Sequence, residues 1–267
     1  MPYGVGASPS LTTVLAAGSG TRAVWASSDR GSSFAPVVWT LGGWPASVRF
    51  LDEQTVFMGD EVGDRVFRSS DAGQTWSVHM FGRDALPGTR AIESLGGSHA
   101  WIVGGPAFGN GTGATVAYSS DAAQTWTIAT LTDRAHQRAG GTLHGIAVVS
   151  PMEVWVAGEN RQVFHTTDGM RTWTQLDGIP EDVLHFGGVA VRGNTIVLAG
   201  TLGSGAYGLY RSIDGGDTFQ IVGRHARFDA WDPLGVHGVT QTSSGDLWVY
   251  GYGGLLWKYA GVMLDEP

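Results

Sequence analysis

The chain has 267 residues, with 42 glycines, 11 tryptophans and no cysteine, and its formal net charge at pH 7 is −8. The negative charge argues against a nucleic-acid ligand, because a protein that binds one needs a basic face to displace counterions. The lack of cysteine excludes disulfide bonds, and no apolar run approaches the roughly 18 residues of a membrane helix.

One turn sequence recurs five times, about every 45 residues. The second copy is SSDAGQTW, residues 69–76, and the third is SSDAAQTW, residues 119–126. A fixed period in this range is typical of repeat architectures. The aspartates of the five copies are Asp29, Asp71, Asp121, Asp168 and Asp214.

Short apolar or alternating runs lie before and after each turn and predict β-strands. In the fourth repeat they predict strands over residues 145–149, 154–158, 162–166 and 172–176, with the turn between the last two. Equivalents of the second strand begin at Thr13, Thr55, Ala100, Val154, Ile196 and Leu247. Six such strands against five turns indicate that the last repeat lacks a full fourth strand.

Four antiparallel strands per repeat predict an all-β fold, a six-bladed β-propeller of four-stranded blades, formed as a single domain by residues 1–267. Residues 2–7 are expected to form the innermost strand of the first blade. Within each turn the aspartate can accept backbone N–H groups, glycine can take a positive φ, and the final aromatic residue can pack on an adjacent blade. Ala123 and Met170 stand where glycine is usual, which predicts looser turns, with Gly169 taking the left-handed position in the fourth.

The turn pattern SxDxGxTW resembles the Asp-box, or BNR repeat, of the sialidase-like superfamily of β-propellers. The resemblance extends over nearly the whole chain. It implies that the turns join the third and fourth strands of each blade, on the face opposite the usual binding site. The five aspartates are therefore expected to be structural.

Alignment of the repeats on their second strands brings polar residues to one position, at the start of each first strand. There they can line a water-filled channel, hold a metal through imidazole nitrogens, bind an anion or exchange protons. The aligned residues are Tyr3, Arg90, His144, His185 with Phe186, and His237, with Ala46 or a neighbour in the second repeat. We expect His144, His185 and His237 to be the ligands if a divalent metal is the cofactor.

Loops expected on the same face add cations, carboxylates and aromatic rings. Salt bridges among exposed loop charges are the alternative explanation, and each contributes little to stability. Arg134, Arg227, Asp229 and Trp231 are expected to contact a ligand together with Arg90 and His185, Glu159 is a candidate catalytic group, and Trp44 is a further aromatic platform.

Sialidase activity is not expected, because the sialidases that this turn pattern resembles have an Arg-Ile-Pro segment before the first Asp-box, and this chain has none before its first turn. A lyase acting on uronate-containing glycans fits better, with Arg90 at the carboxylate and His144, His237 and Tyr3 exchanging protons. A hydrolase would instead use two carboxylates drawn from Glu61, Glu159, Asp182 and Asp229.

The sequence therefore predicts a carbohydrate-active protein that binds an anionic glycan and cleaves it in the lyase or hydrolase hypothesis. The alternative is a non-catalytic propeller, either a lectin or a scaffold that binds a partner protein in an assembly. Neither nucleic acid nor a membrane is an expected partner. Met1 leads straight into repeat sequence without a signal peptide, so the sequence leaves a cytoplasmic and a secreted localisation open.

Overall fold

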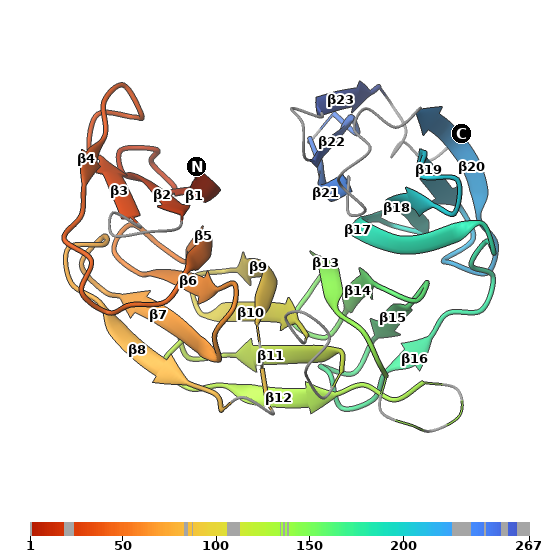
Figure 1. Ribbon diagram of the computed structural model, residues 1–267, viewed down its shortest axis with the longest axis horizontal. Helices are drawn as coiled ribbons and strands as arrows, with labels where there is room; N and C mark the ends of the chain where they lie inside the picture. The colour runs from red at the N-terminus through yellow and green to blue at the C-terminus, as the bar shows by residue number, and fades with distance from the viewer. Residues whose placement is uncertain are drawn as a thin grey trace. The chain divides into compact units, whose positions relative to one another are not determined.

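The computed structural model describes residues 2–18, 24–82, 85–86, 88–105, 113–133, 135, 137, 139–225, 236–242, 244–251 and 256–260. Every regular element in these ranges is a β-strand, and the strands form six antiparallel sheets (Figure 1). The predicted fold class, an all-β propeller of six blades, is confirmed. The described residues contain no helix with the length and hydropathy needed to span a bilayer.

The chain divides into two compact units, and the first comprises residues 1–131 and 138–142. It holds three blades, whose strands are hydrogen-bonded in chain order. The first blade contains β1 (Pro2–Ala7), β2 (Val14–Gly18), β3 (Val24–Ser27) and β4 (Ala35–Pro36), the second contains β5 (Pro45–Phe50), β6 (Val56–Asp60), β7 (Arg65–Ser69) and β8 (Ser77–Met80), and the third contains β9 (Thr89–Leu95), β10 (His99–Gly104), β11 (Thr115–Ser119) and β12 (Thr127–Thr130).

The second unit comprises residues 132–137 and 143–267 and also holds three blades. The last blade has three strands among the described residues, and the expected lack of a full fourth strand stays a prediction. That residues 1–267 form a single domain stays a prediction. The strands of this unit are β13 (Leu143–Val148), β14 (Val154–Gly158), β15 (Val163–Thr166), β16 (Thr174–Gln175), β17 (Val183–Arg192), β18 (Thr195–Leu202), β19 (Tyr207–Ser212), β20 (Gln220–His225), β21 (Val236–Gln241), β22 (Leu247–Gly251) and β23 (Leu256–Tyr259).

Within each unit, the first strand of one blade lies against the first strand of the next blade. Glycine permits this approach, as in the second unit, where a Cβ on Gly145 would lie 2.8 Å from the Cα of Gly188. The expectation that residues 2–7 form the first strand of blade one is confirmed, since β1 pairs with β2 and packs against β5.

Apolar side chains fill the space between consecutive blades of a unit. In the first unit, Leu15 of blade one clusters with Met58 and Phe67 of blade two, and Trp76 packs against this cluster. Trp126 of blade three packs in the same way on Phe57 of blade two, with ring centroids 5.9 Å apart. These aromatic residues that end a turn therefore pack on the preceding blade, as predicted.

The five turns lie between the third and fourth strands and share one set of hydrogen bonds. In the second blade, Asp71 Oδ1 accepts the backbone N–H of Thr75 at 2.8 Å, and Asp71 Oδ2 accepts the Thr75 hydroxyl at 2.5 Å. The hydroxyl of Ser69 donates to Asp71 and accepts the N–H of Gly73 at 2.8 Å. Equivalent bonds to the carboxylate are made in the turns of Asp29, Asp121, Asp168 and Asp214.

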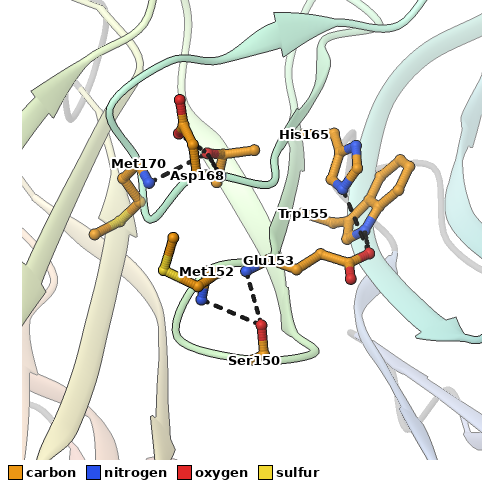
Figure 2. Close-up of polar contacts among 8 residues, drawn as sticks. Ser150, Met152, Glu153, Trp155, His165, Asp168 and Met170 are labelled. Atoms are coloured by element: carbon orange, nitrogen blue, oxygen red, sulfur yellow. Dashed lines mark hydrogen bonds and ion pairs between the residues drawn. The ribbon is translucent and has the colours of Figure 1, made fainter.

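Two turns lack the usual glycine. They keep the bond to the Ser or Thr hydroxyl, at 3.0 and 3.2 Å against 2.8 Å for Gly73, and that they are looser stays a prediction. Ala123 has a φ of 60°, and its N–H donates to Ser119 Oγ at 3.0 Å. Met170, labelled in Figure 2, has a φ of 69°, and its N–H donates to Thr166 Oγ1 at 3.2 Å. The hydroxyl of the first turn residue thus holds even a side-chain-bearing residue in the left-handed region. Gly169, at a φ of 70°, takes the preceding left-handed position rather than replacing that of Met170.

Candidate functional site

The first strand of every blade has a β-bulge at the same position. In β9, for example, Thr89 pairs with Gly104 and Ala91 pairs with Val103, so that Arg90 is left without a partner residue in the ladder. We call the residues left out in this way the bulge residues. They are Tyr3, Ala46, Arg90, His144, Gly187 and His237.

Five of these six are the residues that the sequence alignment brings to one position, and blade five is the exception. His185 pairs with Thr201, two residues before the bulge, and the bulge residue is Gly187. The glycine that follows the bulge gives the correct alignment, because Gly188 corresponds to Gly145 and the histidine before Gly145 is the bulge residue His144. The sequence alignment placed His185 at this position, two residues before the bulge residue Gly187.

Bulges and turns lie at opposite ends of each blade. In blade three, Ala100 of the second strand pairs with Ser119, where the turn begins, whereas Gly104 at its other end pairs with Thr89 beside the bulge. A bulge bends its strand and redirects the side chain of the extra residue. Six side-chain positions are therefore redirected at the end away from the turns.

The bulge itself does not require a polar residue. Ala46 in blade two and Gly187 in blade five occupy it as Arg90 and His144 do. The backbone geometry is thus a property of the blade. A separate reason is needed for the charged and titratable side chains found there in other blades.

In the first unit, the bulge residue Arg90 forms an ion pair with a carboxylate of the preceding blade. Its Nη1 lies 3.1 Å from Oε1 of Glu61, which follows β6, and the two side chains are 22% and 24% exposed. This guanidinium is partly desolvated and already has a counterion. An external anion would have to compete with Glu61 for it.

In the second unit, the equivalent carboxylate meets a histidine. Glu159 follows β14 as Glu61 follows β6, and its Oε1 lies 3.6 Å from Nε2 of the bulge residue His144. The rings of His144 and His185 lie 6.2 Å apart between centroids, and the main chain of Glu159 forms a bridge with that of His185. His237 is exposed on β21, which lies beside β17. These groups offer a proton-exchanging imidazole next to a carboxylate that can orient it.

Asp182, a candidate carboxylate for hydrolysis, is engaged in a local network. It accepts the hydroxyl hydrogen of Tyr210 at 2.8 Å and lies 3.1 Å from Nη2 of Arg224. Burial and the hydrogen bond to Asp182 raise the pKa of Tyr210. These contacts link the segment before β17 to β19 and β20 of the same blade.

Several predicted site residues cannot be placed. The side chain of Tyr3 and the residues Arg134, Arg227, Asp229 and Trp231 lie outside what the structure describes. Arg90 belongs to one unit and the three histidines to the other, and their convergence stays a prediction. In the described part of the chain, no group of three or more His, Asp or Glu residues is arranged as metal ligands are. That His144, His185 and His237 hold a metal stays a prediction.

No family model matches the chain, and no curated protein matches it. Among solved structures, YCF48 bound to D1 peptide has a TM-score of 0.66 and 20% identity, covering 96% of this chain and 78% of its own. A GH74 xyloglucanase from Xanthomonas campestris has a TM-score of 0.70 and 18% identity, covering 100% and 46%, and a GH74 enzyme from Niastella koreensis has 0.63 and 17%, covering 98% and 37%. The chain thus spans less than half of each GH74 enzyme. At these identities the likeness shows the fold alone, a β-propeller.

Proposed function

We propose that the protein binds an acidic glycan through its bulge residues, and that His144 exchanges a proton with the bound sugar. The observation that carries this proposal is that the bulge is present in all six blades, whereas the type of the bulge residue differs between blades. An identical backbone feature in six blades carries Arg, His, Tyr, Ala and Gly. Different side chains on a repeated backbone feature are what an asymmetric ligand requires.

The chemistry suited to His144 is elimination next to a uronate carboxylate. The imidazole takes the proton from the carbon that bears the carboxylate. The electron pair left behind forms a carbon–carbon double bond, the bond to the glycosidic oxygen breaks, and a proton from His237 neutralises that oxygen. Glu159, 3.6 Å from Nε2 of His144, can orient the imidazole for this step.

The acidic groups of the glycan need a cation, and Arg90 is our candidate in the first unit. Its guanidinium can leave Glu61 for a sulfate or carboxylate in bidentate geometry. The match of the five turns to the Asp-box pattern and the shared fold of two GH74 enzymes support a carbohydrate ligand. Both are analogies of sequence pattern and fold, and the bulge residues carry the argument.

A second function, binding of a partner protein, is favoured by a different observation. The matched YCF48 structure holds a D1 peptide, and this chain covers 78% of that protein against less than half of either GH74 enzyme. Most of a propeller that binds a peptide is therefore matched by this chain. In that case the bulge residues would bind acidic side chains of the partner.

An array of uronate-bearing, sulfated and neutral oligosaccharides tests the proposal. We expect the acidic oligosaccharides to bind, and His144→Ala and His237→Ala to abolish binding of at least the uronate-bearing members. His79→Ala is the matched control, since His79 lies on β8, away from the bulges. Release of an unsaturated uronate, followed by its ultraviolet absorbance, would show elimination. Failure of every oligosaccharide to bind would overturn the proposal and favour a protein partner.

A further inference from the structure

Trp44 is an exposed aromatic residue with an unusually constrained backbone. It lies in the segment before β5, two residues before the bulge residue Ala46, and 47% of it is exposed. Burying an indole ring is strongly favourable, so an exposed one next to a bulge calls for an explanation.

Both backbone groups of Trp44 are hydrogen-bonded to the end of β6. The N–H of Trp44 donates to Oδ1 of Asp60 at 3.0 Å, and its carbonyl accepts the N–H of Glu61 at 2.9 Å. The bond from Glu61 to the Trp44 carbonyl lies one residue beyond the pair Pro45 and Asp60, the last pair of β5 with β6. The position from which the ring projects is therefore fixed before any ligand arrives.

The group that fixes it is a buried charge. The side chain of Asp60 has no exposure, and its Oδ2 lies 2.9 Å from Nε of Arg65. Oδ1 also accepts the N–H of Val62 at 3.3 Å. Removing a carboxylate from water is costly unless it is paired and hydrogen-bonded, and here those bonds hold the Trp44 segment.

Two glycines let the chain reach this arrangement. Gly42 and Gly43 have φ values of 64° and 76°, in the region that favours glycine. A Cβ on Gly43 would also lie 3.0 Å from Cζ of Phe67 and 2.5 Å from Oδ2 of Asp60. The segment is thus shaped around the buried carboxylate, and the tryptophan is the large side chain it leaves exposed.

We infer that Trp44 is a stacking platform for a pyranose ring of the bound glycan. The C–H bonds on one face of a pyranose pack against an aromatic ring, and an aromatic residue held in place loses little conformational entropy on binding. The inference rests on the proposed glycan binding and adds a ligand contact in the first unit. Glu61, bonded to the Trp44 backbone and 3.1 Å from Arg90, supplies a charged pair beside the platform for sugar hydroxyls.

Calorimetric titration with the uronate tetrasaccharide that binds most tightly on the array tests the inference. Trp44→Ala should weaken binding about tenfold, and Trp44→Phe should weaken it less, because a smaller ring keeps part of the stacking. Phe34→Ala is the control, since Phe34 is 42% exposed but lies in the first turn, and its affinity should equal that of the parent. Equal affinity of Trp44→Ala and the parent would overturn the inference and leave glycan binding intact.

A direct spectroscopic measurement separates stacking from an indirect effect on folding. In protein labelled with 5-fluorotryptophan, the resonance missing from Trp44→Phe is assigned to Trp44, and we expect the tetrasaccharide to shift it. Asp60→Ala, which removes the acceptor of the Trp44 N–H, should weaken binding through loss of position although the ring is kept. An unshifted resonance at saturation would overturn the inference. Absence of any glycan binding by the parent protein would overturn both it and the proposed function.

Discussion

The two ends of each blade are built on opposite rules. At one end, five turns repeat both their backbone and their side chains, so that an aspartate, a Ser or Thr hydroxyl and two left-handed residues recur in each. At the other end, six bulges repeat the backbone but not the side chain. Repetition of side chains marks a role within a single blade, which is to close the hairpin between its third and fourth strands. Variation on a repeated backbone marks a role that belongs to the protein as a whole.

The ion pairs next to the bulges sharpen this contrast. Glu61 and Glu159 occupy the same place in their blades, but one meets Arg90 of the next blade and the other meets His144 of its own. One carboxylate position thus serves a permanent cation in the first unit and a titratable group in the second. Nothing of this kind distinguishes one turn from another.

Acidification should produce the largest effect, because it acts on all the turns together. Burial raises the pKa of Asp71, but hydrogen bonds from Thr75 and Ser69 outweigh burial and lower this pKa to about 2. The pKa of Asp121 is also lowered to about 2, and the hydrogen bond from the Thr125 hydroxyl is the largest cause. Because the pKa of these carboxyl groups is lower in the folded than in the unfolded chain, they stabilise the folded protein at pH values above the unfolded pKa of 3.8. This stabilisation is lost as the pH falls towards the folded pKa of about 2. Urea unfolding between about pH 5 and about pH 2 measures the loss of stability. A free energy of unfolding that does not change with pH would contradict the role of the turns.

Removal of one turn carboxylate should have the next largest effect. Asp71→Ala leaves the Thr75 N–H and two hydroxyls without their acceptor, and we expect the free energy of unfolding to fall by about 1–3 kcal/mol. Asp217→Ala, at an exposed turn position, should change it by less than about 0.5 kcal/mol. Glycan binding should be the same in both variants. Weaker binding by Asp71→Ala at unchanged stability would assign the turns to the site.

The left-handed turn positions allow a paired test in opposite directions. Gly73→Ala should destabilise the protein by about 1–2 kcal/mol, since φ is 90° there and the new Cβ would lie 2.9 Å from Cδ1 of Leu15. Ala123→Gly should stabilise it by a few tenths of a kcal/mol or more, because relief of strain is partly offset by unfolded-chain entropy. Thermal melts of the two variants against the parent measure both signs. A destabilised Ala123→Gly would mean that packing of the buried methyl group outweighs the strain.

The smallest effect on stability is expected at the bulges. His237→Ala should change the free energy of unfolding by less than about 0.5 kcal/mol, because His237 is exposed and Ala46 shows that the bulge accepts alanine. The same variant should lose binding of uronate-bearing glycans. A loss of several kcal/mol instead would make the bulge residues part of the scaffold and remove the contrast between the two ends.

Local chemistry made much of this protein predictable from its sequence. The period of the turns, the alternation of the strands and the sixth second strand, which begins at Leu247, predict six blades, because hairpins depend on neighbouring residues. The alignment on second strands even reaches five of the six bulge residues. It fails in blade five because the hairpin between β17 and β18 is one residue shorter than the hairpin of blade four: Ile196 pairs with Val191, five residues earlier, whereas the equivalent Val154 pairs with Val148, six residues earlier.

Contacts between distant residues were decided only by the tertiary structure. The sequence offers Glu61, Arg90, Glu159 and His144 as separate charges, and only packing of one blade on the next brings Glu61 to Arg90. The contact between the buried Asp60 and Trp44 also depends on tertiary structure. The blade around the Asp60 carboxylate removes it from water, so the carboxylate is stabilised only by hydrogen bonds and an ion pair within the blade. Turns follow from residues adjacent in the chain, whereas the charges at the bulges acquire partners only when neighbouring blades and strands pack.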